Sequence, residues 1–118
     1  MSFTHLHTHS HFSLLEGVTA PAALAERAAQ FRMPALALTD HNTLYGAVEF
    51  YQVCRAAEVR PVIGLELDTD EGDRLVLLAR DAEGYRRLCR LSSAIRAPAA
   101  AIRPRRRWAR PPTKARRR

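Results

Sequence analysis

The chain has 118 residues, and 47% of them are hydrophobic, which is enough for a single domain with a modest core. Its formal net charge of +7 is typical of a nucleic-acid-binding protein, but the charge is unevenly distributed. Residues 97–118 hold eight arginines and one lysine without any acid, whereas residues 1–96 hold ten arginines and all twelve acids. The composition therefore gives no reason to treat residues 1–96 as a basic nucleic-acid-binding domain.

Nothing in the sequence indicates a membrane or secreted protein. The chain has no run of eighteen apolar residues, and residues 1–5 do not form the basic and then apolar segments of a signal peptide. The cysteines, Cys54 and Cys89, have no partner at metal-ligand spacing, so we expect reduced, half-buried thiols. We therefore expect a cytoplasmic protein with no membrane partner.

The first part of the chain predicts a strand and a helix. Residues 3–9 alternate in character, with histidines at every second position, which indicates a strand. Thr19 can cap a helix that has Pro21 in its first turn and ends before Pro34. The inward face of this helix is expected to contain Leu24, Ala28 and Phe31.

The next segment predicts a buried strand and a second helix. Residues 35–38 are apolar throughout, as expected for a strand that is buried on both faces of a parallel sheet. A helix capped by Asn42 or Thr43 should follow and run to about Val59. Its apolar face is expected to contain Leu44, Val48, Tyr51 and Cys54 or Arg55.

Two more strands and a third helix complete the expected order. Residues 62–67 predict a third strand, and an acidic turn at 68–73 joins it to a fourth strand at 75–79 as a hairpin. Asp81 can cap the last helix, whose inward side chains would be Tyr85, Leu88, Leu91 and Ile95. This alternation predicts an α/β fold, either a βα barrel or an open parallel sheet.

The apolar pattern stops at Ala97, so we predict one domain over residues 1–96 and a disordered tail rich in Arg, Pro and Ala over residues 97–118. In the tail, Trp108 could stack on a nucleobase, although a solvated basic tail is the simpler interpretation. A third interpretation is an out-of-frame segment, because Arg, Pro and Ala all have codons rich in G and C.

Candidate metal ligands follow each of the first three predicted strands. His7 and His9 close the first strand, Asp40 and His41 follow the second, and Glu66 lies near the end of the third. The carboxyl ends of parallel strands face one rim, so these side chains should converge there. Because residues two apart on a strand point to the same side, both early histidines can face one ion or two neighbouring ions.

The residue types favour a catalytic metal site. Glu16, in the loop after the first strand, can add a carboxylate to the imidazoles, and such a set suits a cluster of zinc, manganese or iron ions. Glu66 stands in an apolar strand, where an unpaired carboxylate is costly, so we expect a cation beside it. Asp40 could bind metal, or it could instead cap a helix or orient a histidine. His5 and His11 are expected to be ordinary surface or core histidines.

Clustered metal ions of this kind typically hydrolyse phosphate esters. We take His9, His41 and Asp40 as the candidate catalytic residues. The sequence contains no phosphate-binding Gly-rich loop, nucleophilic serine elbow or dinucleotide fingerprint, which argues against a P-loop nucleotide hydrolase.

Three segments resemble motifs of the PHP (polymerase and histidinol phosphatase) family, in the form found at the amino terminus of bacterial DNA polymerase III alpha subunits. These are residues 3–17, 37–51 and 61–67, and residues 75–91 continue the pattern. The resemblance implies a distorted, TIM-like βα barrel with a metal cluster, of which this chain holds the first three to four strands. It also matches family ligand positions to His7, His9, Glu16, His41 and Glu66.

The resemblance further implies a role in DNA replication. PHP domains hydrolyse phosphoesters, and some polymerase PHP domains proofread as 3′–5′ exonucleases or support the polymerase structurally. The implied partners are a DNA 3′ end or another phosphoester substrate, the remainder of the polymerase, and other replisome subunits.

Two departures from the family pattern bear on activity. Arg74 stands where the family often has a histidine, and an arginine cannot ligate a metal ion. The chain also lacks the later barrel strands with their ligands and the polymerase palm, fingers and thumb. We therefore expect the chain to be incomplete and weakly active or inactive alone. A similar loss of ligands in error-prone, DnaE-type relatives leaves that branch open.

Two other function classes remain open at this point. One is a stand-alone PHP phosphoesterase that acts on a small phosphorylated metabolite. The other is a non-catalytic structural or DNA-binding module, for which DNA binding should be salt-sensitive and should depend on residues 97–118.

Overall fold

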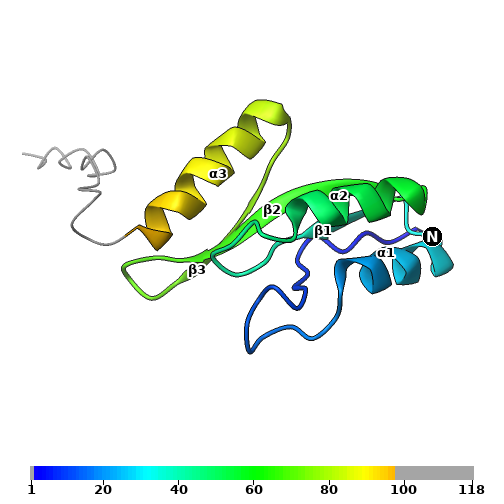
Figure 1. The fold of residues 1–118 in the computed structure, drawn as a ribbon, viewed down its shortest axis with the longest axis horizontal. Helices are drawn as coiled ribbons and strands as arrows, with labels where there is room; N and C mark the ends of the chain where they lie inside the picture. The colour runs from blue at the N-terminus through cyan, green and yellow to red at the C-terminus, as the bar shows by residue number, and fades with distance from the viewer. Residues whose placement is uncertain (1, 98–118) are drawn as a thin grey trace, which may run out of the picture.

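The computed structural model describes residues 2–97, which form an α/β arrangement of three helices and three strands (Figure 1). The strands form one sheet in the order β1-β2-β3, with β2 parallel to β1 and antiparallel to β3. This confirms the predicted parallel pair and the predicted hairpin. In chain order the elements are α1 Pro21–Gln30, β1 Ala35–Leu38, α2 Ala47–Ala56, β2 Arg60–Asp68, β3 Arg74–Leu78 and α3 Ala82–Arg96.

The predicted tail falls almost wholly outside the described residues. Residues 98–118, including Trp108, are not described, so the tail's disorder and the domain boundary at residue 96 stay predictions. Within residues 2–97, no helix has both the length and the apolar character that crossing a membrane requires.

Two apolar clusters attach the helices to the sheet. All four residues of β1 are buried, as its continuous apolar run predicts. In Figure 1, α1 and α2 lie near β1, and α3 lies apart from them. The first cluster joins α1 and α2 to β1 and contains Ala25, Ala28, Leu36, Leu38, Phe50, Cys54 and Val59. The second joins α3 to β2 and contains Leu65, Leu67 and Leu88.

Residues 3–9 do not form the predicted strand. The segment runs beside β1, where Ala37 N donates to His5 O at 2.9 Å and Thr39 N donates to Thr8 O at 2.8 Å (Figure 1). The two donors are two residues apart along β1, whereas the two acceptors are three residues apart. The extra residue bends the segment between them and prevents a regular ladder.

The predicted start of the first helix was wrong by one residue. Ala20 is the N-cap of α1 and makes no side-chain capping bond, while the Thr19 carbonyl accepts from His11 N at 2.9 Å. Thr19 therefore belongs to the preceding loop, and Pro21 tolerates the uncapped start because it has no N–H to satisfy. Phe31, predicted to face inward, follows the last helical residue and is exposed.

The second helix begins later than predicted, and of its predicted inward residues Cys54 is buried whereas Val48 and Tyr51 are not. Asn42 has a φ of 55°, and the segment from Asn42 to Gly46 forms a turn before α2 begins at Ala47. With this start, Val48 is 62% exposed and Tyr51 is also exposed. The residues that face the core are Ala47, Phe50 and Cys54.

The third helix agrees with its prediction at the amino-terminal end. The Asp81 side chain caps α3 by accepting from Gly84 N at 2.8 Å. Of the four side chains predicted to face inward, Leu88 is buried, Tyr85 and Leu91 are half-buried, and Ile95 is exposed.

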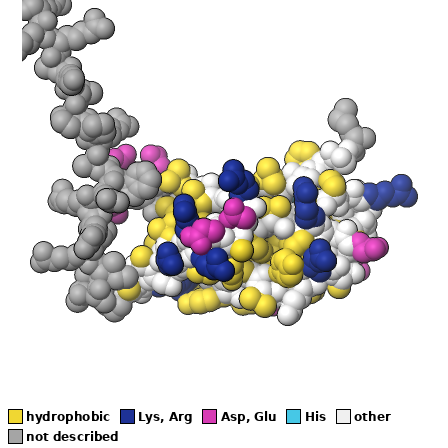
Figure 2. Space-filling view, turned by 90° about the horizontal axis from the view of Figure 1, so that it is seen from above, with side chains coloured by type: hydrophobic (Ala, Val, Ile, Leu, Met, Phe, Trp, Pro, Cys, Tyr) yellow, Lys and Arg dark blue, Asp and Glu magenta, His cyan; other side chains and the backbone are white. Residues whose placement is uncertain are grey.

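Acidic and basic side chains are interspersed with hydrophobic ones on the face shown in Figure 2. Charges of both signs are therefore present on this face, as expected from the ten arginines and twelve acids of residues 1–96.

The buried face of α2 can be tested by comparing two truncations. Phe50→Ala should lower the free energy of unfolding by about 3–5 kcal/mol, because it leaves a cavity where a fully buried ring packed. Val48→Ala should change it by less than about 0.5 kcal/mol, since that side chain lies at the surface. Urea unfolding followed by circular dichroism measures both, and equal losses would contradict the assigned face.

The two thiols should react differently, because burial raises the pKa of Cys54 to about 11. Only the thiolate is nucleophilic, so at pH 8 a maleimide should label the half-buried Cys89 and leave Cys54 unmodified until the protein unfolds. Cys89→Ser should abolish labelling of the native chain and Cys54→Ser should not. Rapid labelling of native Cys89→Ser would show that the α2 core is open.

Candidate metal centre

The pairing of β1 with β2 continues beyond the end of β1 and brings His41 beside Glu66. Within the strands Leu38 is the partner of Ile63, and the bridge between His41 and Glu66 keeps the same register. Glu66 N donates to Asp40 O at 3.1 Å, and Asn42 N donates to Glu66 O at 2.7 Å. The backbone therefore fixes where the Glu66 side chain leaves the sheet.

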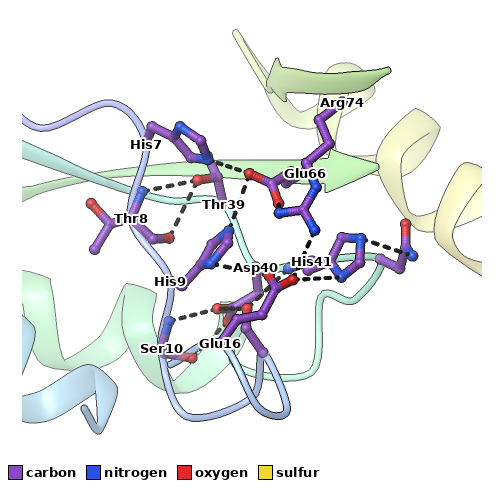
Figure 3. A network of polar contacts seen from close by, with 12 residues as sticks. His7, Thr8, His9, Ser10, Glu16, Thr39, Asp40, His41, Glu66 and Arg74 are labelled. Atoms are coloured by element: carbon purple, nitrogen blue, oxygen red, sulfur yellow. Dashed lines mark hydrogen bonds and ion pairs between the residues drawn. The ribbon is translucent and has the colours of Figure 1, made fainter. Parts of the chain in front are cut away.

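The amino-terminal segment brings His7 and His9 to the same place. Thr8 N donates to Thr39 Oγ1 at 3.0 Å, which adds to the bond between Thr39 N and Thr8 O. The two histidines that flank Thr8 both approach Glu66 (Figure 3). His7 Nε2 pairs with Glu66 Oε2, and His9 Nε2 lies 3.2 Å from the same oxygen.

The atoms of this group suit a divalent metal ion. One ligand atom from each of His7, His9 and Glu66 lies within 4.8 Å of the others. The Glu66 side chain is only 1% exposed, so its charge needs a cationic partner. His9 Nε2 is buried and has no hydrogen-bond partner in the described part of the chain, because the contact with Glu66 lacks hydrogen-bond geometry. Zinc, manganese and iron ions are coordinated by imidazole nitrogens and carboxylate oxygens of this kind.

Glu16 and His41 lie next to this group. Glu16 Oε2 is 3.4 Å from His9 Nδ1, and Glu16 Oε1 is 3.8 Å from His41 Nδ1. His41 Nε2 in turn lies 2.8 Å from Asp68 Oδ2 at the end of β2. The five candidate ligands from the sequence are therefore brought together, and Asp68, which the sequence placed in an acidic turn, joins them.

Arg74 lies among the acidic groups. Its Nη2 donates to Glu16 Oε1 at 2.9 Å, its Nη1 donates to Glu66 Oε1 at 3.1 Å, and its Nε is 3.4 Å from Asp68 Oδ1 (Figure 3). The hydrogen bond from Arg74 is the main cause that lowers the pKa of Glu16, with smaller contributions from the charges of Arg74, His41 and His9. The bond to Glu16 likewise raises the pKa of Arg74.

Asp40 has different neighbours from the other predicted site residues. Its Oδ1 accepts from Ser10 N at 2.6 Å and from Ser13 Oγ at 2.7 Å, and its Oδ2 accepts from Ser10 Oγ at 2.7 Å. The Ser13 hydroxyl also accepts from His41 N at 3.0 Å. The buried Asp40 carboxylate thus fixes the loop that carries Glu16. Through Ser13 it also fixes the backbone of His41.

Gly17 closes that same loop. A Cβ at this position would lie 2.1 Å from the carbonyl oxygen of Ser10, so only glycine allows the close approach. Sequence reasoning missed Ser10, Ser13 and Gly17 as parts of the site. The available signal was their position inside the first motif, residues 3–17.

Two pockets lie near the sheet, and one of them reaches the histidines. A pocket of about 400 Å³ lies between the amino-terminal segment and α1, and His5, His7 and His9 line it. A larger pocket of about 510 Å³ lies between α2, β2 and the start of α3, and none of the candidate ligands lines it. His5 and His11 are both exposed and lie outside the ligand group.

Comparison with curated proteins shows similarity to bacterial DNA polymerases. The chain is 40% identical over 107 residues to "DNA polymerase III subunit alpha" of Chlamydia trachomatis, an alignment that covers 79% of this chain and 9% of that protein. It is 48% identical over 94 residues to "Error-prone DNA polymerase" of Symbiobacterium thermophilum, covering 80% of this chain and 9% of the relative. The chain therefore spans about a tenth of the length of these relatives.

Solved structures of proteins that are not named as polymerases have a similar fold. An amidohydrolase from Chromobacterium violaceum matches with a TM-score of 0.63 and 30% identity, over 77% of this chain and 32% of that one. A protein from Bifidobacterium adolescentis, whose name describes a metal-dependent phosphoesterase, matches with a TM-score of 0.55 and 22% identity, over 77% of this chain and 34% of that one. The second likeness concerns the fold alone. The PHP domain family model matches residues 5–113, and by this match and by its relatives the chain belongs to the PHP family.

Proposed function

We propose that the chain is the metal-binding phosphoesterase module of a DNA polymerase III alpha-type protein and that it hydrolyses a phosphodiester at a DNA 3′ end. The observation that carries this proposal is the meeting of two imidazoles with a buried carboxylate within 4.8 Å. The names of the similar curated proteins, which are DNA polymerases, favour DNA as the substrate and the rest of a polymerase as the partner.

In this proposal, His7, His9 and Glu66 hold a zinc, manganese or iron ion, and Glu16 faces the same space. A bound divalent ion would activate water and neutralise phosphate oxygens. We assign proton transfer to His41, because Asp68 at 2.8 Å orients its imidazole while the side chain stays partly open to solvent. Asp40 then acts by positioning the loop of Glu16 and not by touching the substrate.

A second candidate is a non-catalytic module that supports the polymerase. The contacts of Arg74 favour it, since the guanidinium engages Glu66, a proposed ligand, and Glu16, which faces the same space. The two candidates differ in whether metal binding is accompanied by hydrolysis.

Hydrolysis should depend on metal and on the histidine cluster. With added manganese, the chain should shorten a 5′-labelled DNA oligonucleotide from its 3′ end, and His7→Ala should lower the rate by about 100-fold or more because it removes a ligand. His11→Ala is the matched control, since this exposed histidine lies outside the cluster. Metal content is measured alongside the rate.

The outcomes separate the function classes. Metal binding without hydrolysis of DNA or of a generic phosphate ester would support the non-catalytic module, and hydrolysis of the generic ester alone would support a small phosphorylated substrate. Equal metal content in wild type and His7→Ala would contradict the proposed centre.

Asp40→Asn should separate a positioning role from direct ligation. The amide keeps the shape but offers a single oxygen to three donors, so the free energy of unfolding should fall by about 1–3 kcal/mol. The number of bound metal ions should stay the same, with weaker affinity as the loop of Glu16 loosens. Metal analysis together with urea unfolding measures both effects, and a lost ion in a folded variant would identify Asp40 as a ligand.

A further inference from the structure

The guanidinium of Arg74 lies where the carboxylates of the site converge. Each of its three nitrogens approaches a different acid, namely Glu16, Glu66 and Asp68, at 2.9 to 3.4 Å. An arginine that merely stabilised the hairpin would need only Asp68, its cross-strand partner. The contacts with Glu16 and Glu66 join β3 to the amino-terminal loop and to the buried end of the proposed metal site.

We propose that the Arg74 guanidinium takes the place of a second cation in this site, so that the chain binds one divalent ion, at His7, His9 and Glu66. This inference rests on the metal centre described under the proposed function. It adds that the other half of the site, made of Glu16, His41 and Asp68, is closed to metal by an arginine of the chain itself.

The formal charges of the site support a single ion. Three carboxylates, those of Glu16, Glu66 and Asp68, meet one guanidinium, which leaves two negative charges when the imidazoles are neutral. One divalent ion balances that charge. Without the guanidinium a third negative charge is uncompensated, and the site should attract a second cation.

The ligands for a second ion are otherwise present. His41 lies 2.8 Å from Asp68 and 3.8 Å from Glu16, so one imidazole and two carboxylates already face one another. Three protein ligands with open positions for water are a common catalytic arrangement. Arg74 donates to Glu16 Oε1 and lies 3.4 Å from Asp68 Oδ1, so its positive charge already stands against both carboxylates and would repel a metal ion there.

The test is the metal stoichiometry of the full chain with substitutions at position 74. Wild type and Arg74→Lys, which both carry a cation, should bind about one manganese ion per chain, and Arg74→His should bind about two. Arg80→Gln is the control for the loss of one positive charge, since this exposed arginine lies outside the site. Each protein is titrated with manganese by calorimetry, and bound metal is measured after desalting.

Thermal unfolding with and without manganese provides a readout other than activity. Arg74→His should be less stable than wild type in chelator, because three carboxylates then lack their cation, and it should gain more from manganese than wild type does. If Arg74→His is unfolded in chelator, saturating manganese should restore its circular dichroism spectrum. Failure to recover with metal would overturn the proposal.

The remaining outcomes are distinct. One ion in both wild type and Arg74→His would overturn the role of Arg74 and leave the metal centre intact. Binding of two ions by wild type would also overturn the proposed role of Arg74. If wild type binds no metal and His7→Ala has the same metal content, the metal centre itself is refuted, and with it the proposed function.

Discussion

The arrangement of the site depends on one buried charge, the carboxylate of Glu66. Its main chain is fixed by pairing with residues 40 and 42, and its side chain has almost no contact with solvent. An uncompensated carboxylate in such a place costs several kcal/mol, so cationic or hydrogen-bonding partners must come to it. They come from the amino-terminal segment, as His7 and His9, and from β3, as Arg74. Three segments that are distant in sequence therefore meet around the two carboxylate oxygens of Glu66.

The second buried carboxylate, that of Asp40, stabilises the loop between Ser10 and Gly17. The loop between Ser10 and Gly17 leaves Leu14 and Leu15 exposed, so it has little hydrophobic support. Its conformation is maintained by the bonds from Ser10 and Ser13 to Asp40 and by the close approach at Gly17. Since this loop carries Glu16, the buried Asp40 also positions Glu16 against His9 and Arg74, which both contact Glu66. Asp40 and Glu66 are equally buried but have different roles because their neighbours differ. Asp40 accepts hydrogen bonds from serines, whereas Glu66 contacts two imidazoles and a guanidinium.

Sequence patterns predicted the elements whose signal is local, and missed those that depend on distant partners. The apolar run 35–38 and the hairpin at β2 and β3 were found, and the convergence of ligands followed from the common direction of β1 and β2. The bend in residues 3–9 could not be foreseen, because it arises from one extra residue opposite β1. Val48 and Tyr51 were wrongly placed on the buried face of α2 because they are apolar and lie at helical spacing with Cys54, which is buried. Whether Asp40 binds metal could not be decided without knowing that Ser10 and Ser13 lie against it.

The reach of Arg74 into the site is a consequence of hairpin register. On β2, Glu66 and Asp68 point to the same side, and pairing Asp68 with Arg74 places the arginine on that side, diagonal to Glu66. A slip of one residue would turn Arg74 to the opposite face and leave the buried carboxylate without it. The turn prevents the slip: Thr69 N donates to Asp73 O at 2.8 Å, Gly72 N donates to Thr69 O at 3.0 Å, and Gly72 has a φ of 88°, which glycine adopts without strain. The turn of residues 69–73, which contributes no group to the site, therefore determines which cation stands beside Glu66.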